Sequence, residues 1–415
     1  MHPQTHSPAA RMTTDSIAAT TPYLSLGAGQ RPAHGGASVL HLLRHLDQSA
    51  EARMAVDFAA AVTETGGRAG IAYHSGAATP ELQRNGTPSI EIKLGGRAPF
   101  SGYGAAKRLA KLIAESGVEI VHAHGLDLLL VARAAVEEAG VKLVLGFNGD
   151  PERAAHLTKR QRAALEGTDE VIVHSDLTRR ELMAAVPTLR GRITTAPYGI
   201  DLTSFDPAQV TARRVIQLAQ LWRVPDDRPV VMLPGRFARS RGHGALVEAL
   251  SLIRDVDLRC IMLGPDAEGP AFRHQLIKEI GQLGLGDRVQ LVEECRDMPA
   301  ALMLADVVVA PYLEPGVHNR AVIEAMALGR PVVASEFPLT RELLEENEMA
   351  WIAAPGDAMA LSWAIREALG LAAEQREGLS VHVIERMHAS RNREHLCAAA
   401  LDIYERMRPG DAVAA

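Results

Sequence analysis

Short apolar runs alternate with amphipathic stretches of helical length from Ala37 onward, and this alternation limits the folds open to the chain. The first examples are "SVLHLL", "EARMAVDFAAAVTETGG" and "AGIAYH". Strands that are apolar throughout are typical of parallel sheets covered by helices on both faces, because neither face meets water. The pattern therefore predicts an α/β fold of doubly wound parallel sheets.

The alternating series occurs twice, and a break at "GIDLTSFDPAQV" separates the two. Two sheets joined by a proline-containing linker would leave a cleft, and open sheets bind ligands outside the carboxyl ends of their strands. The predicted organisation is a flexible leader (1–36), a first α/β domain (37–200), a linker (201–228), a second α/β domain (229–390), a helix that returns to the first domain (391–408) and a tail (409–415).

Composition narrows the functional classes. The net charge of -6 gives no general reason to expect nucleic-acid binding. Cys260, Cys295 and Cys397 are far apart, so neither a disulfide framework nor a zinc site is indicated. The sequence has no apolar run of about 18 residues and its start lacks the order of a secretory signal. We therefore expect a cytoplasmic protein.

A polar turn in "PYLEPGVHNRAVIEAMALGRPVVAS" leads into a helix and suggests a ligand site at the helix mouth. The amides near Val317, His318 and Asn319 would lie at the helix N-terminus, where unpaired N–H groups and the helix dipole attract an anion. Glu324 lies one turn into this helix, and its carboxylate could reach a vicinal diol such as a ribose. The alternative is an ordinary capped helix with a dipole-favourable acid.

The segment "LPGRFARSRGHGALVEAL" places Gly235 and Arg236 directly after a strand, and Arg241 before a helix. Two guanidinium groups on one strand-to-helix loop can clamp a phosphoryl group, and the glycines allow the backbone to approach it. The alternative is a pair of solvated surface arginines. Gly264, at the end of the strand "LRCIMLG", marks either part of the same site or a plain connecting turn.

Two histidines, His122 and His124, fall at a strand's carboxyl end in "EIVHAHG", where we expect them to face the cleft. Their spacing of two places both on the same side of the strand. A metal would need a third ligand, and the sequence indicates none, so we predict no metal site. The alternative is that both are polar strand-end residues without chemistry.

Two predicted helices carry basic side chains. They could contact anionic lipid headgroups or an acidic partner, or could simply be solvated helix faces. The residues are Lys107, Arg108 and Lys111 in the first helix, and Lys159, Arg160 and Arg162 in the second.

Taken together, residues 37 to 407 resemble the retaining glycosyltransferases of family four. The segments that carry the resemblance are "GVEIVHAHG", "DEVIVHS", "APYGIDLTSFDP", "LPGRFARSRG", "GLGDRVQLVEECRDMPAALMLADVVVAPYLEP", "AVIEAMALGRPVVAS" and "APGDAMALSWAI". The resemblance implies the GT-B fold, in which two Rossmann-like domains face each other across a cleft. The first domain would be the acceptor side, and the second would bind a nucleotide sugar.

The resemblance also implies roles for single residues. Arg236 and Arg241 match the family's donor-diphosphate cations, with Arg241 where the family usually has Lys. Glu324 matches the ribose-binding glutamate. The loop Glu294, Cys295 and Arg296 would hold the base, with Gly235, Gly264, Val317, His318, Asn319 and Arg320 completing the donor site. Asn148 would act with Arg236 and Arg241 at the reacting sugar, and Ser49 and His124 would contact the sugar or the acceptor.

Three parts of the sequence depart from the family's pattern. Gly316 stands where the family has its sugar-binding glutamate. Gln48, Ser49 and Ala50 replace a Gly-Gly pair, and their side chains restrict the backbone approach that glycine permits. Asn148 replaces a histidine, so this side chain can form a hydrogen bond to a sugar hydroxyl but cannot accept a proton near neutral pH.

These observations favour a glycosyltransferase that moves a hexose-type sugar from a nucleotide-diphosphate donor to a glycan or lipid-linked acceptor with retention. No metal is required, because arginines and a helix dipole can supply the positive charge. Its role would be in cell-surface polysaccharide or lipopolysaccharide synthesis at the inner face of the membrane. The alternative is a catalytically inert relative that senses nucleotide sugars or serves as the scaffold partner of an active transferase.

Overall fold

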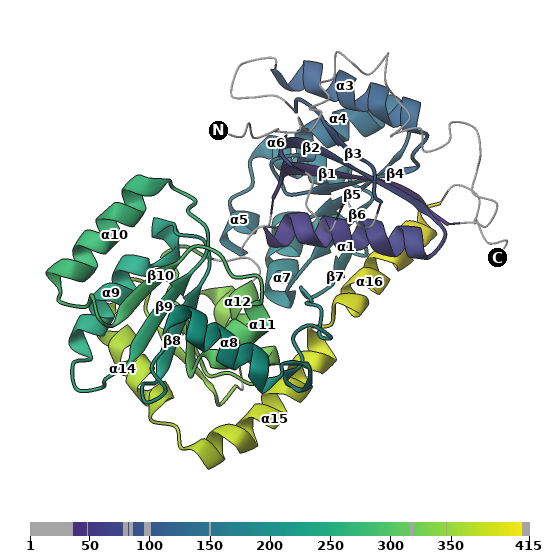
Figure 1. The fold of residues 1–415 in the computed structure, drawn as a ribbon. Helices are drawn as coiled ribbons and strands as arrows, with labels where there is room; N and C mark the ends of the chain where they lie inside the picture. The colour runs from purple at the N-terminus through teal and green to yellow at the C-terminus, as the bar shows by residue number, and fades with distance from the viewer. Residues whose placement is uncertain are drawn as a thin grey trace, which may run out of the picture. The chain divides into compact units, whose positions relative to one another are not determined.

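The computed structural model describes residues 36–47, 49–77, 82, 86–94, 101–148, 151–315, 319–345 and 347–408 (Figure 1). These residues form two compact units. One unit contains the chain up to Ala196 and the segment from Leu396 onward, and the other contains Pro197–His395. None of the helices among the described residues is long and apolar enough to cross a lipid bilayer.

The first unit is built on a seven-stranded sheet in the order β3-β2-β1-β4-β5-β6-β7, and every neighbouring pair is parallel. The order runs outward in both directions from β1, as the doubly wound pattern requires. The strands are β1 (Ser38–Leu46), β2 (Arg68–Gly76), β3 (Ser89–Glu91), β4 (Ile120–His124), β5 (Lys142–Gly146), β6 (Glu170–Val173) and β7 (Ile193–Thr195).

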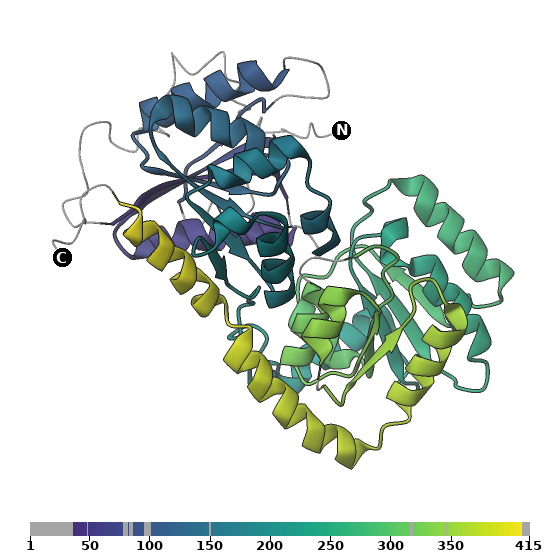
Figure 2. The same ribbon diagram turned by 180° about the vertical axis from the view of Figure 1, so that it is seen from behind.

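Helices cover both faces of this sheet, and the alternation of side chains along β1 separates the two faces. Leu40 and Leu42 join a core with residues of α3, α4 and α6, whereas His41 lies against Phe58 of α1 and Tyr404 of α16. Figures 1 and 2 show α1 and α16 on the other side of this sheet from α3 and α4. The helices are α1 (Ala50–Glu64), α3 (Ser101–Ser116), α4 (Leu129–Ala139), α5 (Pro151–Ala155), α6 (Lys159–Glu166), α7 (Asp176–Ala185), the 3-10 turn η2 (Pro187–Leu189) and α16 (Arg393–Arg406).

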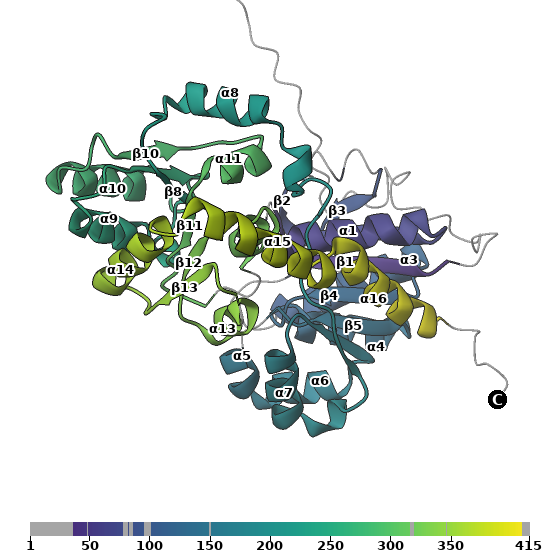
Figure 3. The same ribbon diagram turned by 90° about the horizontal axis from the view of Figure 1, so that it is seen from below.

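The second unit is built on a six-stranded parallel sheet in the order β10-β9-β8-β11-β12-β13. Its strands are apolar because helices cover both faces of the sheet. On one face, α9, α10 and α14 pack over the main core of the unit (Figure 3). The strands are β8 (Val230–Pro234), β9 (Arg259–Leu263), β10 (Val289–Val292), β11 (Val307–Ala310), β12 (Val332–Ser335) and β13 (Ala350–Ala353).

The helices of the second unit follow its strands in the order expected of βα units. They are η3 (Pro207–Gln209), α8 (Ala212–Trp222), η4 (Arg239–Arg241), α9 (His243–Leu252), α10 (Pro270–Gln282), α11 (Met298–Leu304), α12 (Arg320–Ala327), α13 (Pro338–Leu344), α14 (Ala358–Leu369) and α15 (Ala373–Ser390).

The predicted fold class, two doubly wound parallel-sheet units, is confirmed. The segment expected to be a linker differs, because residues 201–228 contain η3 and α8 and belong to the second unit. Arg214 of α8 binds Asp297, the N-cap of α11, at 2.6 Å, so this segment is packed structure. The leader and the tail were predicted for residues 1–36 and 409–415, which fall outside the described residues except for Gly36.

Candidate active site

The mouth of α12 has an unusual cap. Asn319, the N-cap residue, takes the left-handed conformation with φ 43° and makes no side-chain bond to the helix amides. Its side-chain amide instead donates to the Thr340 hydroxyl at 3.1 Å. Within the described residues, the Asn319 side chain therefore does not cap these amides, and the amides of Val322 and Ile323 donate to the Asn319 carbonyl instead.

Glu324 lies inside α12 with only 5% of its surface exposed. Arg320, one turn earlier, binds its carboxylate at 2.5 Å, and the pair is separated by four residues. The first turn of α12 contains no acidic residue, so the dipole explanation for Glu324 does not hold. A nearly buried carboxylate held by a guanidinium is positioned rather than free to rotate, as a group that recognises a diol must be.

Two glycines allow the loops after β8 and β9 to touch. A Cβ atom at Gly264 would lie 2.0 Å from the Gly235 carbonyl oxygen, and both residues have positive φ angles. The Gly235 amide also donates to the Leu263 carbonyl at 2.8 Å. A side chain at Gly264 would separate the loops, so sterics require glycine there, whereas Gly235 has open space for a Cβ atom and is constrained only by its positive φ. Gly264 thus belongs to the same edge of the sheet as Gly235.

The two predicted cations lie on the loop after β8. Arg236 is exposed and, within the described part of the chain, makes no side-chain hydrogen bond or ion pair. Arg241 packs its guanidinium over the Tyr312 ring at 4.5 Å. Burial raises the pKa of Tyr312, with the Arg241 cation opposing that shift and the Glu324 charge adding to it. Tyr312 therefore lies between the predicted phosphate-binding arginine and the predicted ribose-binding acid.

Backbone contacts fix this arrangement. Gly242 has φ 73°, and a Cβ atom there would lie 1.7 Å from the Pro311 carbonyl oxygen. The Leu313 amide donates to the Ser240 carbonyl at 2.8 Å, which ties the loop after β11 to the loop after β8. The clamp arginine and the segment leading to α12 are thus held together without relying on side chains alone.

The loop after β10 carries the residues predicted to hold a base. Glu294 and Arg296 are exposed and form an ion pair at 3.3 Å, while Cys295 is half-buried and burial raises its thiol pKa. Exposed ion pairs contribute little to stability, so these side chains can rearrange around a ligand. Val317, His318, Gly316 and Gln48 lie outside the described residues, and their predicted roles remain predictions.

In the first unit, the residues predicted for the sugar or the acceptor surround the start of α1. Ser49 caps this helix, since its hydroxyl accepts from the Ala52 amide at 3.3 Å. Asn148 follows β5, and its Oδ1 atom lies 3.1 Å from His174 Nε2. His174 Nδ1 in turn faces the Ala196 carbonyl oxygen at 2.8 Å, which fixes the ring. Asn148 is therefore a positioned polar group at the carboxyl edge of the sheet.

Sequence reasoning missed Glu51, which lies in the first turn of α1. Burial raises the pKa of Glu51 to about 7, and the charges of Asp127 and Asp47 add to the shift while the Asn148 side chain opposes it. A Cβ atom at Gly125 would lie 3.0 Å from the Glu51 carboxylate and 2.8 Å from that of Asp127. The edge predicted to contact an acceptor thus carries two close carboxylates, and one of them titrates near neutral pH.

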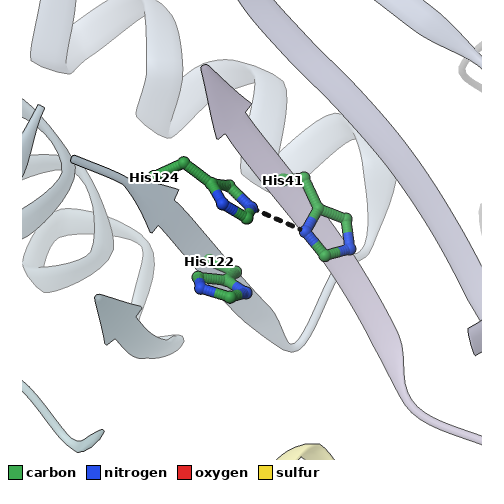
Figure 4. A group of neighbouring side chains, drawn as sticks. All are labelled: His41, His122 and His124. Carbon is green, nitrogen blue, oxygen red and sulfur yellow. Dashed lines mark hydrogen bonds between the residues drawn. The ribbon is translucent and has the colours of Figure 1, made fainter. Parts of the chain in front are cut away.

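The prediction that His124 faces an open site is wrong. Its side chain is fully buried, and its Nε2 atom lies 3.1 Å from His41 Nδ1 (Figure 4). The environment of His124 is set by the face of the sheet to which its side chain points, and not by its place at the end of the strand. Phe58 stacks against His124 on this face, with 6.1 Å between the ring centroids. The expectation that no third histidine accompanies His122 and His124 is also wrong, because His41 completes a group of three.

The basic side chains of the two predicted basic helices, α3 and α6, make different contacts. On α3, Lys107 lies over the ring of the exposed Tyr103 at 4.8 Å, and Lys111 pairs with Glu115 at 3.6 Å. On α6, Arg162 donates to the Ala185 carbonyl at 2.6 Å and so serves the packing of its own unit. Contact of either helix with a membrane remains a prediction.

The fold is the two-unit GT-B fold of solved glycosyltransferase structures. It is similar to a glycosyltransferase from Rickettsia africae, with a TM-score of 0.78 and 21% identity, covering 89% of this chain and 98% of that one. It is also similar to Anabaena HepE in complex with UDP and glucose, with a TM-score of 0.75 and 19% identity, covering 88% and 99%. Both structures share the two-unit architecture of parallel sheets.

Family models give the finer assignment. "Glycosyltransferase Family 4" matches residues 52–204 and "Glycosyl transferases group 1" matches residues 228–370, so the chain belongs to the glycosyltransferases that carry this pair of domains. It is 24% identical over 319 residues to the phosphatidyl-myo-inositol mannosyltransferase of Mycolicibacterium smegmatis, covering 74% of this chain and 77% of that protein. It is 29% identical to the α-D-kanosaminyltransferase of Streptomyces kanamyceticus, but that match spans 47% of this chain and only 50% of the relative.

Proposed function

We propose that this protein transfers a hexose-type sugar from a nucleotide-diphosphate donor to a glycan or lipid-linked acceptor, with retention at the anomeric carbon. The observation that carries the proposal is the group formed by Arg241, Tyr312 and the pair Arg320 and Glu324 at the N-terminal end of α12. A cationic loop and a helix N-terminus suit the diphosphate of a nucleoside diphosphate, and a held carboxylate suits its ribose.

The leaving diphosphate gains negative charge as the sugar bond breaks, and stabilising that charge lowers the barrier. Arg236 is exposed and available for a phosphate oxygen, while Arg241 is held against Tyr312. The amides after Asn319 add the positive end of a helix dipole. The transfer therefore needs no metal for charge neutralisation. The donor's own phosphate would accept the acceptor's proton, as the family resemblance implies.

Recognition of the rest of the donor would fall to three further groups. Glu324 would accept hydrogen bonds from the ribose hydroxyls, with Arg320 holding its orientation. The exposed loop with Glu294, Cys295 and Arg296 would contact the base. In the first unit, Asn148 would donate to or accept from a sugar hydroxyl, with His174 fixing its position.

The relatives support the choice of substrate class. The mannosyltransferase named above acts on a phosphatidyl-inositol by its name, and the HepE structure contains UDP and glucose. We infer by likeness that the donor is a nucleotide sugar and that the acceptor is a glycan or a lipid-linked glycan of cell-surface polysaccharide or lipopolysaccharide synthesis. With such an acceptor, the protein would act at the inner face of the membrane. The basic residues of α3 around Lys107 and of α6 around Lys159 would contact the membrane surface.

The test has two stages with the full-length protein. Calorimetry with UDP, GDP and ADP should show one nucleoside diphosphate bound in the micromolar range, and absence of binding at millimolar concentration would contradict the proposal. The matching nucleotide sugars are then tested for transfer and for slow donor hydrolysis. Binding without either reaction would show that the protein is a nucleotide-sugar sensor and not a transferase.

A further inference from the structure

Three histidines of the first unit lie on one face of its sheet because of strand register. His41 of β1 is the direct partner of His122 on the parallel neighbour β4. His124 lies two residues further along β4 and so points to the same side. Figure 4 shows the three rings grouped between the two strands. All three side chains are fully buried.

The ring nitrogens of these residues are close enough to share one ion. One nitrogen from each ring can be chosen so that all three lie within 4.8 Å of one another. His41 Nδ1 and His124 Nε2 are 3.1 Å apart. Two nitrogens bound to a tetrahedral zinc ion at 2.0–2.1 Å would be separated by about 3.3 Å. One pair therefore already has the spacing of two zinc ligands.

The hydrogen bonding of the group is incomplete. His41 Nε2, His122 Nε2 and His124 Nδ1 are buried and have no hydrogen-bond partner among the described residues. A Cβ atom at Gly146 would lie 3.2 Å from His122 Nε2 and 3.7 Å from His124 Nδ1. Because residue 146 is a glycine, it places no side chain against these two nitrogens. Buried polar atoms without partners are rare in folded proteins, and a metal bound at His122 Nε2 would explain one of the three.

The chemistry of the group suits a metal of intermediate softness. Full burial disfavours the charged imidazolium, so all three rings keep a lone pair at neutral pH. Neutral imidazole is the form that binds metals. Three histidines without a carboxylate favour Zn²⁺ over Mg²⁺ or Ca²⁺, which prefer oxygen ligands.

We propose that His41, His122 and His124 form a zinc-binding site in the first unit, on the face of the sheet covered by α1 and α16. Zinc would take one nitrogen from each ring and replace the hydrogen bond between His41 and His124. A water molecule would supply the fourth ligand. The His122 and His124 rings stack with centroids 4.1 Å apart, which brings the two ligands of β4 side by side.

Tyr404 gives the site its outer support. Its hydroxyl lies 2.6 Å from His122 Nδ1, which leaves His122 Nε2 for the metal. Histidine ligands commonly use the second nitrogen in this way, and the contact fixes the ring and its tautomer. Since Tyr404 belongs to α16, zinc would strengthen the attachment of this helix to β4. The site is therefore structural, and the proposed transfer chemistry does not depend on it.

The experiment uses the full-length chain without a histidine tag, because the sequence has 16 histidines and surface sites must be separated from this one. The protein is stripped with a chelator, dialysed against zinc chloride and analysed by elemental mass spectrometry. One zinc per chain should remain after extensive dialysis, and Co²⁺ in its place should give the intense visible absorption of a tetrahedral site. Retention of far less than one equivalent would overturn the proposal.

Variants locate the ion. His41→Gln and His124→Gln should each weaken zinc binding at least tenfold. His45→Gln is the matched control, since His45 is an exposed histidine on the same strand, and it should retain one equivalent. An equal loss of zinc binding in all three variants, or no loss in His41→Gln, would refute the assignment. If the buried variants do not fold, thermal unfolding of the wild type decides: Tm should rise with zinc and saturate at one equivalent, and an unchanged Tm would also refute it.

Discussion

His122 and Tyr404 lie 282 residues apart in the chain, yet the Tyr404 hydroxyl and His122 Nδ1 are 2.6 Å apart and both side chains are fully buried. This contact joins the last helix, α16, to a central strand of the first sheet. A buried hydrogen bond whose loss leaves one partner unsatisfied is worth about 1 to 3 kcal/mol. The C-terminal segment is therefore part of the first unit's core.

We expect Tyr404→Phe to lower the free energy of unfolding by about 1 to 3 kcal/mol, because the change removes only the hydroxyl and leaves His122 Nδ1 without its partner. Chemical denaturation followed by circular dichroism measures this value. Tyr103→Phe is the control, since Tyr103 is 68% exposed, and its unfolding should be nearly unchanged. A Tyr404→Phe protein as stable as the wild type would show that the contact does not matter energetically.

Arg236→Ala should weaken nucleoside diphosphate binding at least tenfold, because a charge-assisted hydrogen bond to phosphate contributes roughly 1.5 to 3 kcal/mol. Calorimetric titration measures the change. Arg239→Ala is a matched control on the same loop, since the Arg239 guanidinium is already bound to Glu268 and Gln275. Equal losses in the two variants would indicate a general electrostatic effect of the loop and not a specific clamp.

Glu324→Gln should reduce nucleotide affinity about 10- to 100-fold, since it removes the charge that both accepts from ribose hydroxyls and balances Arg320. Binding of the nucleoside diphosphate is compared with that of inorganic pyrophosphate. Only the nucleotide should lose affinity if the carboxylate recognises the ribose. A parallel loss of pyrophosphate affinity would mean that Glu324 acts by organising the phosphate site, and Glu348→Gln, an exposed change in the same unit, should alter neither.

Gly242→Ala should destabilise the second unit by more than about 2 kcal/mol, because the new methyl group would meet the Pro311 carbonyl at 1.7 Å and the residue has φ 73°. Thermal unfolding measures the loss. Gly286→Ala is the control: nothing lies within 4 Å of a Cβ atom there and its φ is not positive. If both variants unfold at the wild-type temperature, the contact between the two loops is not a constraint.

The fold could be predicted from sequence because buried parallel strands leave a direct trace. Runs such as "VVMLPG" and "DVVVAP" are apolar on both sides, and the helices between them have a separate period. The helix α8 was missed for a related reason: its side chains Ile216 and Leu221 are exposed, so its apolar residues did not indicate a packed helix. Leu218 and Trp222 of this helix are buried, and the ion pair between Arg214 and Asp297, which sequence periodicity cannot show, adds a contact to α11.

The candidate donor site could be proposed from sequence for a similar reason, since Arg236, Arg241 and Glu324 follow strands whose ends share one edge of a sheet. The histidine group was not. His41 and His124 are 83 residues apart, and only the register of β1 against β4 brings them together. The burial of Glu51 could not be predicted from sequence either, because an acidic residue in the first turn of a helix is ordinarily explained by the helix dipole.

Glu51 also makes a prediction about pH. Its pKa is raised from 4.5 to about 7 in the folded protein, with burial as the main cause. Between these two values the folded state holds a proton that the unfolded state has released, so stability falls as the pH rises through this range. Above about pH 7 both states are ionised at this group and the loss is complete.

The comparison of wild type with Glu51→Gln isolates this term, because glutamine keeps the shape and removes the titration. Unfolding temperatures are measured from pH 4.5 to 8. The unfolding temperature of the wild type should fall relative to that of Glu51→Gln as the pH rises. The difference should become constant near pH 7 to 8. Glu64→Gln, an exposed change on the same helix, should follow the wild-type curve in parallel. A pH-independent difference for Glu51→Gln would mean that Glu51 ionises normally and that the first unit's acidic edge is open to water.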